Sequence, residues 1–411
     1  MLPDMRNAVR MLGLVAALAE ASGCQQTDLA LMERAEGLAV STARPLRVLM
    51  YGHIPPYRGG LAHPALAAWL EARFEQHAEQ QIDLQLRFGD TYALTPTSPE
   101  LVGPDGYDVI EIDLAALPPI AAALGPWAGV DPRRLVPAGV AAGQASQGLL
   151  WPTYLCSHVI YARDRRIADA HDLADLGRTL RQLARGKPAL VGDLYGDGML
   201  SGLYADAWFD RTAGTQPHPS TIEREVVADL RQLVGLCGPS TRDNPCLNDA
   251  FDLTKGERTA GIEAMVRGDA AGWLGFSEHA HYALRAGATA DTLHVVSAPL
   301  GPGTHPALFV DGLARSRRCT GQCQRDATTL AYFLTSAEVQ ASLALGDDPE
   351  AGGIPRYLML ASRAFWERPE VTRDALYAQL RPIAFAPSLL PALEAPEPAL
   401  RDALTAPAAD R

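Results

Sequence analysis

The sequence predicts an α/β protein of two lobes, each a mixed, mainly parallel sheet flanked by helices, with a ligand cleft between the lobes. Strand-like and helix-like segments alternate from residue 45 onward, which is typical of an α/β fold. An extended apolar run at residues 150–160 separates two such series, as expected where a chain crosses from one lobe to another. The 411 residues, of which 47% are hydrophobic, can form two cores.

The first lobe is predicted to begin with residues 45–51, a β-branched and aliphatic run that favours a strand. A loop follows, and residues 63–79 then carry apolar side chains at helical spacing. Residues 82–88 alternate apolar and polar side chains like a second strand, and residues 107–113 like a third. A strand, a helix and two further strands in succession indicate a mainly parallel sheet.

The second lobe is predicted to comprise residues 151–289. Its expected elements are a helix at 172–185, a strand at 188–191, helices at 200–211, 221–236 and 258–267, and a strand at 270–277. Residues 294–300 are expected to re-enter the first lobe, which would comprise residues 45–150 and 290–345. Helices near 326–344 and 371–378 are expected in the last third, with residues 346–411 packing on the lobes.

The N-terminus has the pattern of an export signal. Arg6 and Arg10 precede a short apolar run, and small residues lie just before Cys24. This pattern predicts a signal peptide over residues 1–23, lipidation of Cys24 as in bacterial lipoproteins, and a tether over residues 24–44. We therefore expect an exported protein that is periplasmic, membrane-anchored as a lipoprotein, or secreted. The alternative is an unstructured cytoplasmic N-terminus.

Net charge limits the choice of partners. A charge of −12 argues against nucleic acid and favours neutral or cationic small molecules. Beyond the N-terminus no stretch is long and apolar enough for a membrane helix, so we expect membrane contact only through a lipid anchor. We expect a monomer.

Six cysteines are present, and five remain if Cys24 carries lipid. In an oxidising compartment, two close pairs are expected to form disulfides, Cys237 with Cys246 and Cys319 with Cys323. The second pair could instead stay reduced at the start of a helix, although it lacks the further ligands of a zinc site. Cys156 is then an unpaired thiol, either reactive or buried and inert. We expect no metal site.

Two α/β lobes joined by two crossings, on an exported and tethered chain, describe the periplasmic-binding-protein architecture of type II. The ligand there lies between the lobes, at the carboxyl ends of strands. Residues at such positions combine rings, carboxylates and one thiol: Tyr51, Tyr57, Asp113, Cys156, Phe276, Glu278 and Asp311. This set favours a flat cationic ligand, because rings stack on cations and carboxylates offset positive charge.

Three segments resemble thiaminase I (thiamine pyridinylase), an exported enzyme on the two-lobed binding-protein fold. They are YDVIEID at residues 107–113, WPTYLCSHVIY at residues 151–161 and GFSE at residues 275–278, within a resemblance that spans residues 45–365. The resemblance implies that thiamine and a small amine or thiol are the substrates, and that no cofactor takes part.

The same resemblance implies a role for individual residues. Cys156 would be the nucleophile and Glu278 the acid/base group, while Asp113 and Asp311 would hold the aminopyrimidine. Clefts of that family are rich in tyrosine, whereas this chain departs from the pattern with Phe276 beside the glutamate and Phe309 near the aspartate.

The chemistry of thiamine agrees with this set of residues. Thiamine joins a thiazolium to an aminopyrimidine through a methylene, and the thiazole is a leaving group that already carries positive charge. A Cys156 thiolate would add to the pyrimidine, the thiazole would depart, and an amine or thiol would attack the methylene carbon. Glu278 would take the proton of each nucleophile in turn, and the two aspartates would bind the amino group and ring nitrogen.

Other interpretations stay open. Cys156 with His158 suggests a cysteine protease, but no Asn or Asp obviously orients the imidazole. The run Glu278-His-Ala-His281 lacks the histidine spacing of zinc helices, and we expect its histidines to be exposed. Glu278 could simply start a helix, and the two aspartates could cap turns. The main competing function is a solute-binding lipoprotein of an ABC importer for a small cationic or heterocyclic ligand.

Overall fold

The computed structural model describes most of the chain between residues 44 and 406. The predicted signal peptide, Cys24 and all but the last residue of the predicted tether lie outside the described residues. Within the range, the description excludes residues 58–60, 79–81, 104, 197–198, 215–220, 240, 242, 252–258 and 388–396. In the described part, no helix is both long and apolar enough to cross a membrane.

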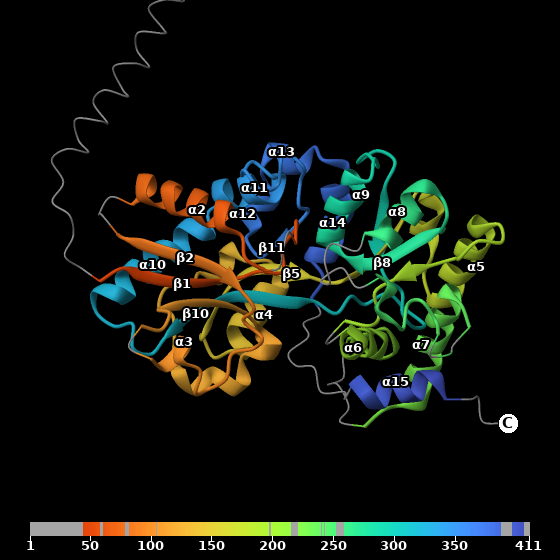
Figure 1. Ribbon diagram of the computed structural model, residues 1–411, viewed down its shortest axis with the longest axis horizontal. Coiled ribbons are helices and arrows are strands. Elements are labelled where there is room, and N and C mark those ends of the chain that lie inside the picture. Colours follow the sequence, from red (N-terminus) through yellow and green to blue (C-terminus); the bar gives the residue numbers. More distant parts are fainter. Residues whose placement is uncertain are drawn as a thin grey trace, which may run out of the picture.

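Two sheets divide the structure into a large and a small lobe, which lie side by side (Figure 1). The large lobe has a seven-stranded sheet in the order β11-β5-β10-β3-β1-β2, with β4 beside β10. Its strands are β1 (Leu46–Tyr51), β2 (Leu84–Gly89), β3 (Val109–Asp113), β4 (Leu124–Gly125), β5 (Leu150–Cys156), β10 (Phe309–Ser316) and β11 (Met359–Leu360). β1 is parallel to β2 and β3, whereas β10 is antiparallel to β3, β4 and β5, and β11 to β5. Both sheets are mixed as predicted, but among the described strands antiparallel pairs outnumber parallel ones, so the expectation of mainly parallel sheets is wrong; strand spacing in the sequence does not encode the direction of the partner strand.

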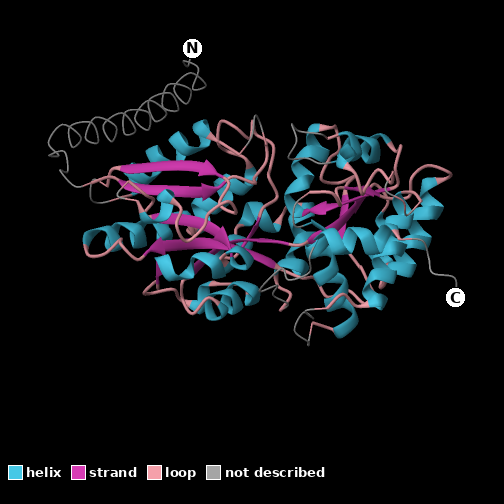
Figure 2. Cartoon of the chain, turned by 60° about the horizontal axis from the view of Figure 1, so that its bottom comes forward, coloured by secondary structure: helices cyan, strands magenta, loops and turns pink. Residues whose placement is uncertain are grey.

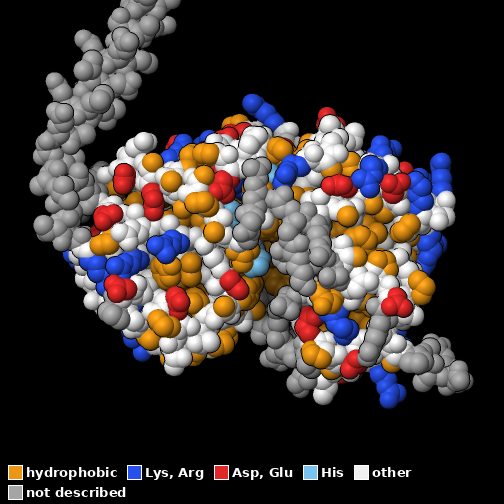
Figure 3. Space-filling view, in the orientation of Figure 1, with side chains coloured by type: hydrophobic (Ala, Val, Ile, Leu, Met, Phe, Trp, Pro, Cys, Tyr) orange, Lys and Arg blue, Asp and Glu red, His pale blue; other side chains and the backbone are white. Residues whose placement is uncertain are grey.

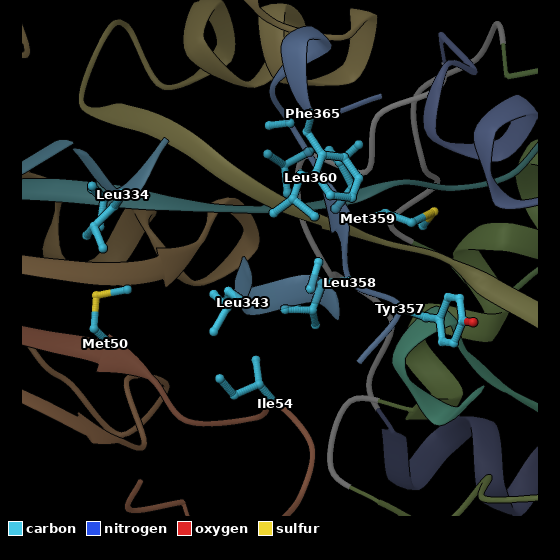
Figure 4. Close-up of a cluster of buried hydrophobic side chains, with 14 of the residues drawn as sticks. Met50, Ile54, Leu334, Leu343, Tyr357, Leu358, Met359, Leu360 and Phe365 are labelled. Atoms are coloured by element: carbon cyan, nitrogen blue, oxygen red, sulfur yellow. The ribbon is translucent and has the colours of Figure 1, made fainter. Parts of the chain in front are cut away.

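The helices of the large lobe bury one apolar face each. In α2, helical spacing places Leu66, Leu70 and Phe74 on the buried side against the sheet. Met50 and Phe365 belong to the same core, part of which is drawn in Figure 4. The helices are α2 (Pro64–His77), α3 (Pro99–Val102), α4 (Pro137–Ala145), α10 (Gln322–Leu334), α11 (Ala337–Leu345), α12 (Arg363–Trp366) and α13 (Pro369–Thr372).

The small lobe has a four-stranded sheet in the order β7-β8-β6-β9, surrounded by helices (Figure 2). Its strands are β6 (His158–Ala162), β7 (Val191–Gly192), β8 (Gly272–Phe276) and β9 (His294–Ser297). Its helices are α5 (Leu173–Ala184), α6 (Met199–Thr212), α7 (Arg224–Cys237), α8 (Ala260–Arg267), α9 (Ala280–Arg285) and α15 (Glu397–Thr405). α15 packs on α6 and α7 through Leu400 and Leu404, and α14 (Ala375–Ala384) contacts β9 of the small sheet and β11 of the large one.

The chain crosses from the large lobe to the small one at Ser157. The predicted strand over residues 150–160 is in fact two strands, β5 in the large sheet and β6 in the small sheet. The expectation that residues 294–300 re-enter the first lobe is wrong, because β9 pairs with β6 in the small sheet. The return is made by β10. Both segments are short and apolar, and periodicity does not encode which distant strand each one joins.

Disulfides join Cys237 to Cys246 and Cys319 to Cys323, and Cys156 is a free, half-buried thiol. The first bond ties the end of α7 to the loop that follows it, and the second lies at the start of α10. Asp108 lies beside the second pair in an arrangement with metal-like spacing. The two sulfurs are bonded to each other, so this group does not offer thiolate ligands.

Candidate active site

Four of the predicted cleft residues lie at one edge of the large sheet. Tyr51, Asp113 and Cys156 end β1, β3 and β5, three strands that run in the same direction. β10 runs the opposite way and starts at this edge, with Asp311 opposite Asp113 and Phe309 opposite Cys156. The sheet topology therefore gathers a ring, a thiol and two carboxylates from segments far apart in the sequence.

Phe276 and Glu278 come from the small lobe, where β8 ends and a 3-10 turn follows (Ser277–His279). The Tyr161 hydroxyl donates to the carbonyl oxygens of Phe276 and Ser277, at 2.9 and 2.6 Å. His279 Nδ1 accepts from the Phe276 amide at 3.2 Å. These bonds hold the backbone on both sides of Glu278.

Position 275, in β8 just before this turn, requires a glycine. A Cβ at this position would lie 2.2 Å from His279 Nδ1 and 2.4 Å from Trp273 Nε1. Those two nitrogens are themselves hydrogen-bonded at 3.3 Å inside the protein. Only glycine fits without moving the histidine that supports the turn.

The two lobes meet around Cys156. The thiol and Phe276 both pack on a small apolar cluster that contains Phe309 and Ala307. In the loop after β1, the Tyr57 amide donates to the Tyr282 hydroxyl of α9 at 2.9 Å, which links the lobes a second time. The face in Figure 3 is hollowed between the lobes, with a histidine side chain visible in the hollow.

Cys156 is a thiol rather than a thiolate in the free protein. Burial raises its pKa well above the ordinary value, and the charges of Glu278, Asp311 and Asp113 raise it further. The side chain therefore needs a base to take its proton. A bound cation would lower its pKa, because positive charge near the sulfur favours the thiolate.

Glu278 has the properties of such a base. It is 9% exposed, and this burial raises its pKa to about 7. Hydrogen bonds to its own backbone and to Ser277 Oγ, 3.2 Å away, lower the pKa by a smaller amount. A carboxyl group that is half ionised near neutral pH can accept and return a proton.

Asp113 and Asp311 form a buried pair of carboxyl groups. Asp113 accepts from the Ala115 amide at 2.6 Å and from the Tyr92 hydroxyl at 3.2 Å, and burial raises its pKa to about 6. Burial, and then the charges of Asp113 and Glu111, raise the pKa of Asp311 well above its ordinary value. Asp311 Oδ1 is buried and has no hydrogen-bond partner among the described residues, so a donor on a ligand would satisfy it.

Three residues near these groups were not predicted. The rings of His53 and Tyr92 lie 4.9 and 5.8 Å from that of Tyr51. Glu111 is fully buried, accepts from Thr153 Oγ1 at 2.7 Å, and has its pKa raised to about 7 by burial. Tyr92 follows the end of β2, so the rule that identified the other strand-end residues could also have found it.

The neighbouring histidines have other partners. His158 Nδ1 shares a hydrogen bond with Asp206 Oδ2 at 3.1 Å. The structure thus places an aspartate beside the imidazole, whereas the sequence showed no residue that would orient it. The expectation that His279 and His281 are exposed is wrong, since they are 6% and 1% exposed. His279 packs against the rings of Trp273 and Phe276 in β8, and His281 Nδ1 bonds with the Pro355 carbonyl at 3.2 Å.

No protein-family model and no curated protein matches the sequence. Solved structures do match in shape. Thiaminase I from Bacillus thiaminolyticus superposes with a TM-score of 0.66 at 18% identity, over 88% of this chain and 98% of that one. Clostridium botulinum thiaminase I in complex with thiamin superposes with a TM-score of 0.67 at 16% identity, over 87% of this chain and 97% of that one.

Binding proteins match nearly as well. The GacH receptor of Streptomyces glaucescens, solved unliganded and with acarbose, gives a TM-score of 0.58 at 15% identity, over 88% of this chain and 94% of that one. The chain has the fold that thiaminase I shares with these receptors. The predicted two-lobed α/β fold is therefore confirmed, and the resemblance to thiaminase I extends from short segments to the whole architecture.

Proposed function

We propose that this protein is a thiamine-degrading transferase, which replaces the thiazole of thiamine with another nucleophile through a covalent cysteine-pyrimidine adduct. The observation that carries the proposal is a free thiol at the junction of the lobes, within the electrostatic reach of Glu278, Asp311 and Asp113. A binding protein has no need for such a thiol. The thiaminase I structures among the matches support the same function.

Binding of thiamine would use the acidic edge of the large sheet. Asp311 Oδ1, which has no partner in the described part of the chain, would accept from the amino group of the pyrimidine, while Asp113 would pair with a protonated ring nitrogen. The rings of Tyr51 and Tyr57 would face the cation. Positive charge in the site would ionise the carboxyl groups whose pKa burial has raised, and would make the Cys156 thiol more acidic.

The first chemical step would form the adduct. The carboxylate of Glu278 takes the Cys156 proton, and the sulfur adds to a pyrimidine ring carbon. The electron pair of that ring then forms an exocyclic double bond at the methylene, and the bond from the methylene to the thiazolium nitrogen breaks. The thiazole leaves as a neutral molecule because its nitrogen keeps the electron pair of the broken bond.

The second step would transfer the pyrimidine. An amine or thiol attacks the methylene carbon, the ring recovers its electrons, and the carbon–sulfur bond breaks to release Cys156 as a thiolate. Glu278 returns its proton to the sulfur and accepts the proton of the incoming nucleophile, which passes to solvent. Two transfers through one covalent intermediate predict ping-pong kinetics.

A direct experiment tests the proposal. Purified protein is incubated with thiamine and aniline, and free thiazole and the pyrimidine-aniline product are followed by mass spectrometry. We expect both to appear together at catalytic amounts. If thiamine is bound and recovered intact at every amine and thiol concentration, the transferase proposal is wrong and the solute-binding alternative, which the match to the GacH receptor favours, takes its place.

We further propose that the protein works without a cofactor, as an exported monomer that contacts the membrane only through lipid on Cys24. The support for export is the N-terminal sequence pattern. Metabolic labelling with a clickable palmitate analogue would label the natural chain and leave a Cys24→Ala variant unlabelled.

A further inference from the structure

A buried histidine-aspartate pair lies behind the thiol. His158 is the first residue of β6, and Asp206 lies in the middle of α6; their side chains are 0% and 1% exposed and are hydrogen-bonded at 3.1 Å. The second carboxylate oxygen of Asp206 accepts from the Ala307 amide at 3.0 Å. Neither residue takes part in the chemistry proposed above, although both are buried and titratable.

Asp206 contacts two of the segments that connect the lobes, one at the start of β6 and one just before β10. His158 comes two residues after Cys156, on the segment that leaves the large lobe. Ala307 comes two residues before Phe309, on the segment that returns, and Phe309 lies opposite Cys156 in the sheet register. One carboxyl group thus holds the chain on both sides of the thiol.

Aromatic rings pack between the His158–Asp206 pair and the Cys156 thiol, so the position of the pair affects the position of the sulfur. The His158 ring lies 4.9 Å from that of Phe276 and 5.6 Å from that of Phe309. Cys156 packs on the same apolar cluster as both phenylalanines. Gly202 leaves room for these rings, because a Cβ there would lie 2.9 Å from Phe309 Cζ and 3.3 Å from His158 Cε1.

Asp210, one turn further along α6, provides a natural comparison. Its carboxylate accepts from the amides of Leu300 and Gly301 at 2.6 and 3.1 Å, and also from that of His305. All three donors lie on the returning segment. Asp210 therefore contacts only the returning segment, whereas Asp206 contacts both the leaving and the returning segment.

We propose that Asp206, acting through His158, is a positioning residue that holds the Cys156 sulfur in the register needed for attack on the substrate. The part of this inference that concerns thiamine rests on the proposed function. The part that concerns the placement of the thiol does not, because it can be measured with a small alkylating reagent.

The test compares three variants with the parent protein. Asp206→Leu removes both hydrogen bonds at similar volume. Asp206→Asn keeps an acceptor for Ala307 and a donor for His158 Nδ1, so it should rescue the position of the thiol. Asp210→Asn is the control on the same helix: it replaces one acceptor oxygen by a donor and so loosens the returning segment alone, without removing a partner of His158. The readouts are the rate of iodoacetamide alkylation of Cys156, the single-turnover rate of thiamine adduct formation, and the dissociation constant for thiamine.

For Asp206→Leu we expect adduct formation to slow at least about tenfold, since small misplacements of a nucleophile cost that much. Alkylation should be at least about threefold faster because the half-buried sulfur is less firmly packed, and the thiamine dissociation constant should stay within about threefold. Asp206→Asn and Asp210→Asn should stay near the parent in all three readouts.

Two results would overturn the inference. One is a folded Asp206→Leu variant with parental alkylation and adduct rates; the other is an equal kinetic loss in Asp210→Asn. If Asp206→Leu does not fold, Gly202→Ala displaces the same rings more gently, and parental rates in that variant would count against the inference. If the parent forms no thiamine adduct, the proposed function fails, and the alkylation rates alone decide the role of Asp206.

Discussion

At the scale of single residues, the proposed chemistry depends on one thiol and one carboxyl group whose ordinary pKa values would not suit them to act together. Burial raises the pKa of Glu278 to about 7, and burial with nearby negative charge keeps Cys156 protonated in the empty site. The proton therefore has to move after a cationic substrate has entered. On this proposal the pair reacts slowly with other electrophiles until the substrate supplies the charge.

Replacing the nucleophile should separate chemistry from binding. For Cys156→Ser we expect turnover to fall by at least roughly a thousandfold, because the hydroxyl is a far weaker nucleophile at neutral pH. Thiamine binding measured by calorimetry should change little, since the ring and carboxylate contacts stay in place. Turnover at the parental rate would show that Cys156 is not the nucleophile.

Replacing the base should change the pH profile as well as the rate. For Glu278→Gln we expect adduct formation to slow by about a hundredfold or more at neutral pH. In the parent the rate should rise with pH through about 7, the raised pKa of Glu278, because the carboxyl group must lose its proton before it can accept one. Stopped-flow or quench measurements across pH should show that this inflection is absent from the variant.

At the scale of elements, the site depends on how strands end and turns are held. β1, β3 and β5 end at one edge because they are parallel to one another, and the 3-10 turn after β8 presents Glu278 from the other lobe. The hydroxyl of Tyr161 supports that turn through two carbonyl oxygens. The position of Glu278 therefore depends on how the backbone of the turn is held rather than on its own side chain.

Removing the Tyr161 hydroxyl tests this dependence. For Tyr161→Phe we expect a loss of about 1–3 kcal/mol in the free energy of unfolding, because two buried carbonyl oxygens lose a donor. Turnover should fall while the Michaelis constant changes little. Tyr377→Phe is the control: its hydroxyl donates to the Ala344 and Leu358 carbonyls at 3.5 and 3.3 Å, and its loss should leave turnover unchanged. Equal losses of activity in both variants would contradict the role of the turn.

At the scale of the whole molecule, buried acids are concentrated at the site and at the segments that join the lobes beside it, at a cost in stability. Burial raises the pKa of Glu111 and Glu278 to about 7 and, together with the charge of Asp206, that of Asp210 to about 8. Buried histidines act in the opposite direction: burial lowers the pKa of His158 and His279 to about 3. The two sets affect stability in different ranges of pH.

We expect the melting temperature to fall as pH rises from about 6.5 to about 8.5, a range set by the ordinary histidine value and the raised acid values. The folded protein holds protons that the unfolded chain has lost on Glu111 and Glu278 up to about pH 7 and on Asp210 up to about pH 8, so rising pH favours unfolding until these groups have ionised. Below about 6.5 the unfolded chain protonates histidines that stay neutral when folded, which opposes the trend.

Calorimetry across this range checks the expectation. Thiamine should restore part of the lost stability at the alkaline end, because its positive charge compensates the ionised carboxyl groups and it binds only the folded state. A Glu111→Gln variant, which keeps an acceptor for Thr153, should show a shallower decline. A melting temperature that rises between the two ends of the range would contradict the assignment of raised pKa values.

Much of this arrangement could be predicted from local sequence. The strand ending in Tyr51, the strand ending in Asp113 and the apolar segment that carries Cys156 follow from periodicity, and the rule for strand ends identified the thiol, the rings and the carboxylates. The predicted cysteine pairs are the pairs bonded in the structure. Such features depend on residues near one another in the chain.

The sequence by itself determined the two-lobed class, the strand ends and the types of group that gather there, because side-chain spacing within a segment fixes its local structure. Tertiary structure alone decided that β9 pairs in the small sheet, that Glu111 is buried behind the site, and that Asp206 contacts both the leaving and the returning segment beside Cys156. Pairing between distant segments depends on which surfaces meet after folding, and burial then sets the pKa of each acid. The spacing of residues within a segment therefore predicts neither the strand pairing nor the pKa values.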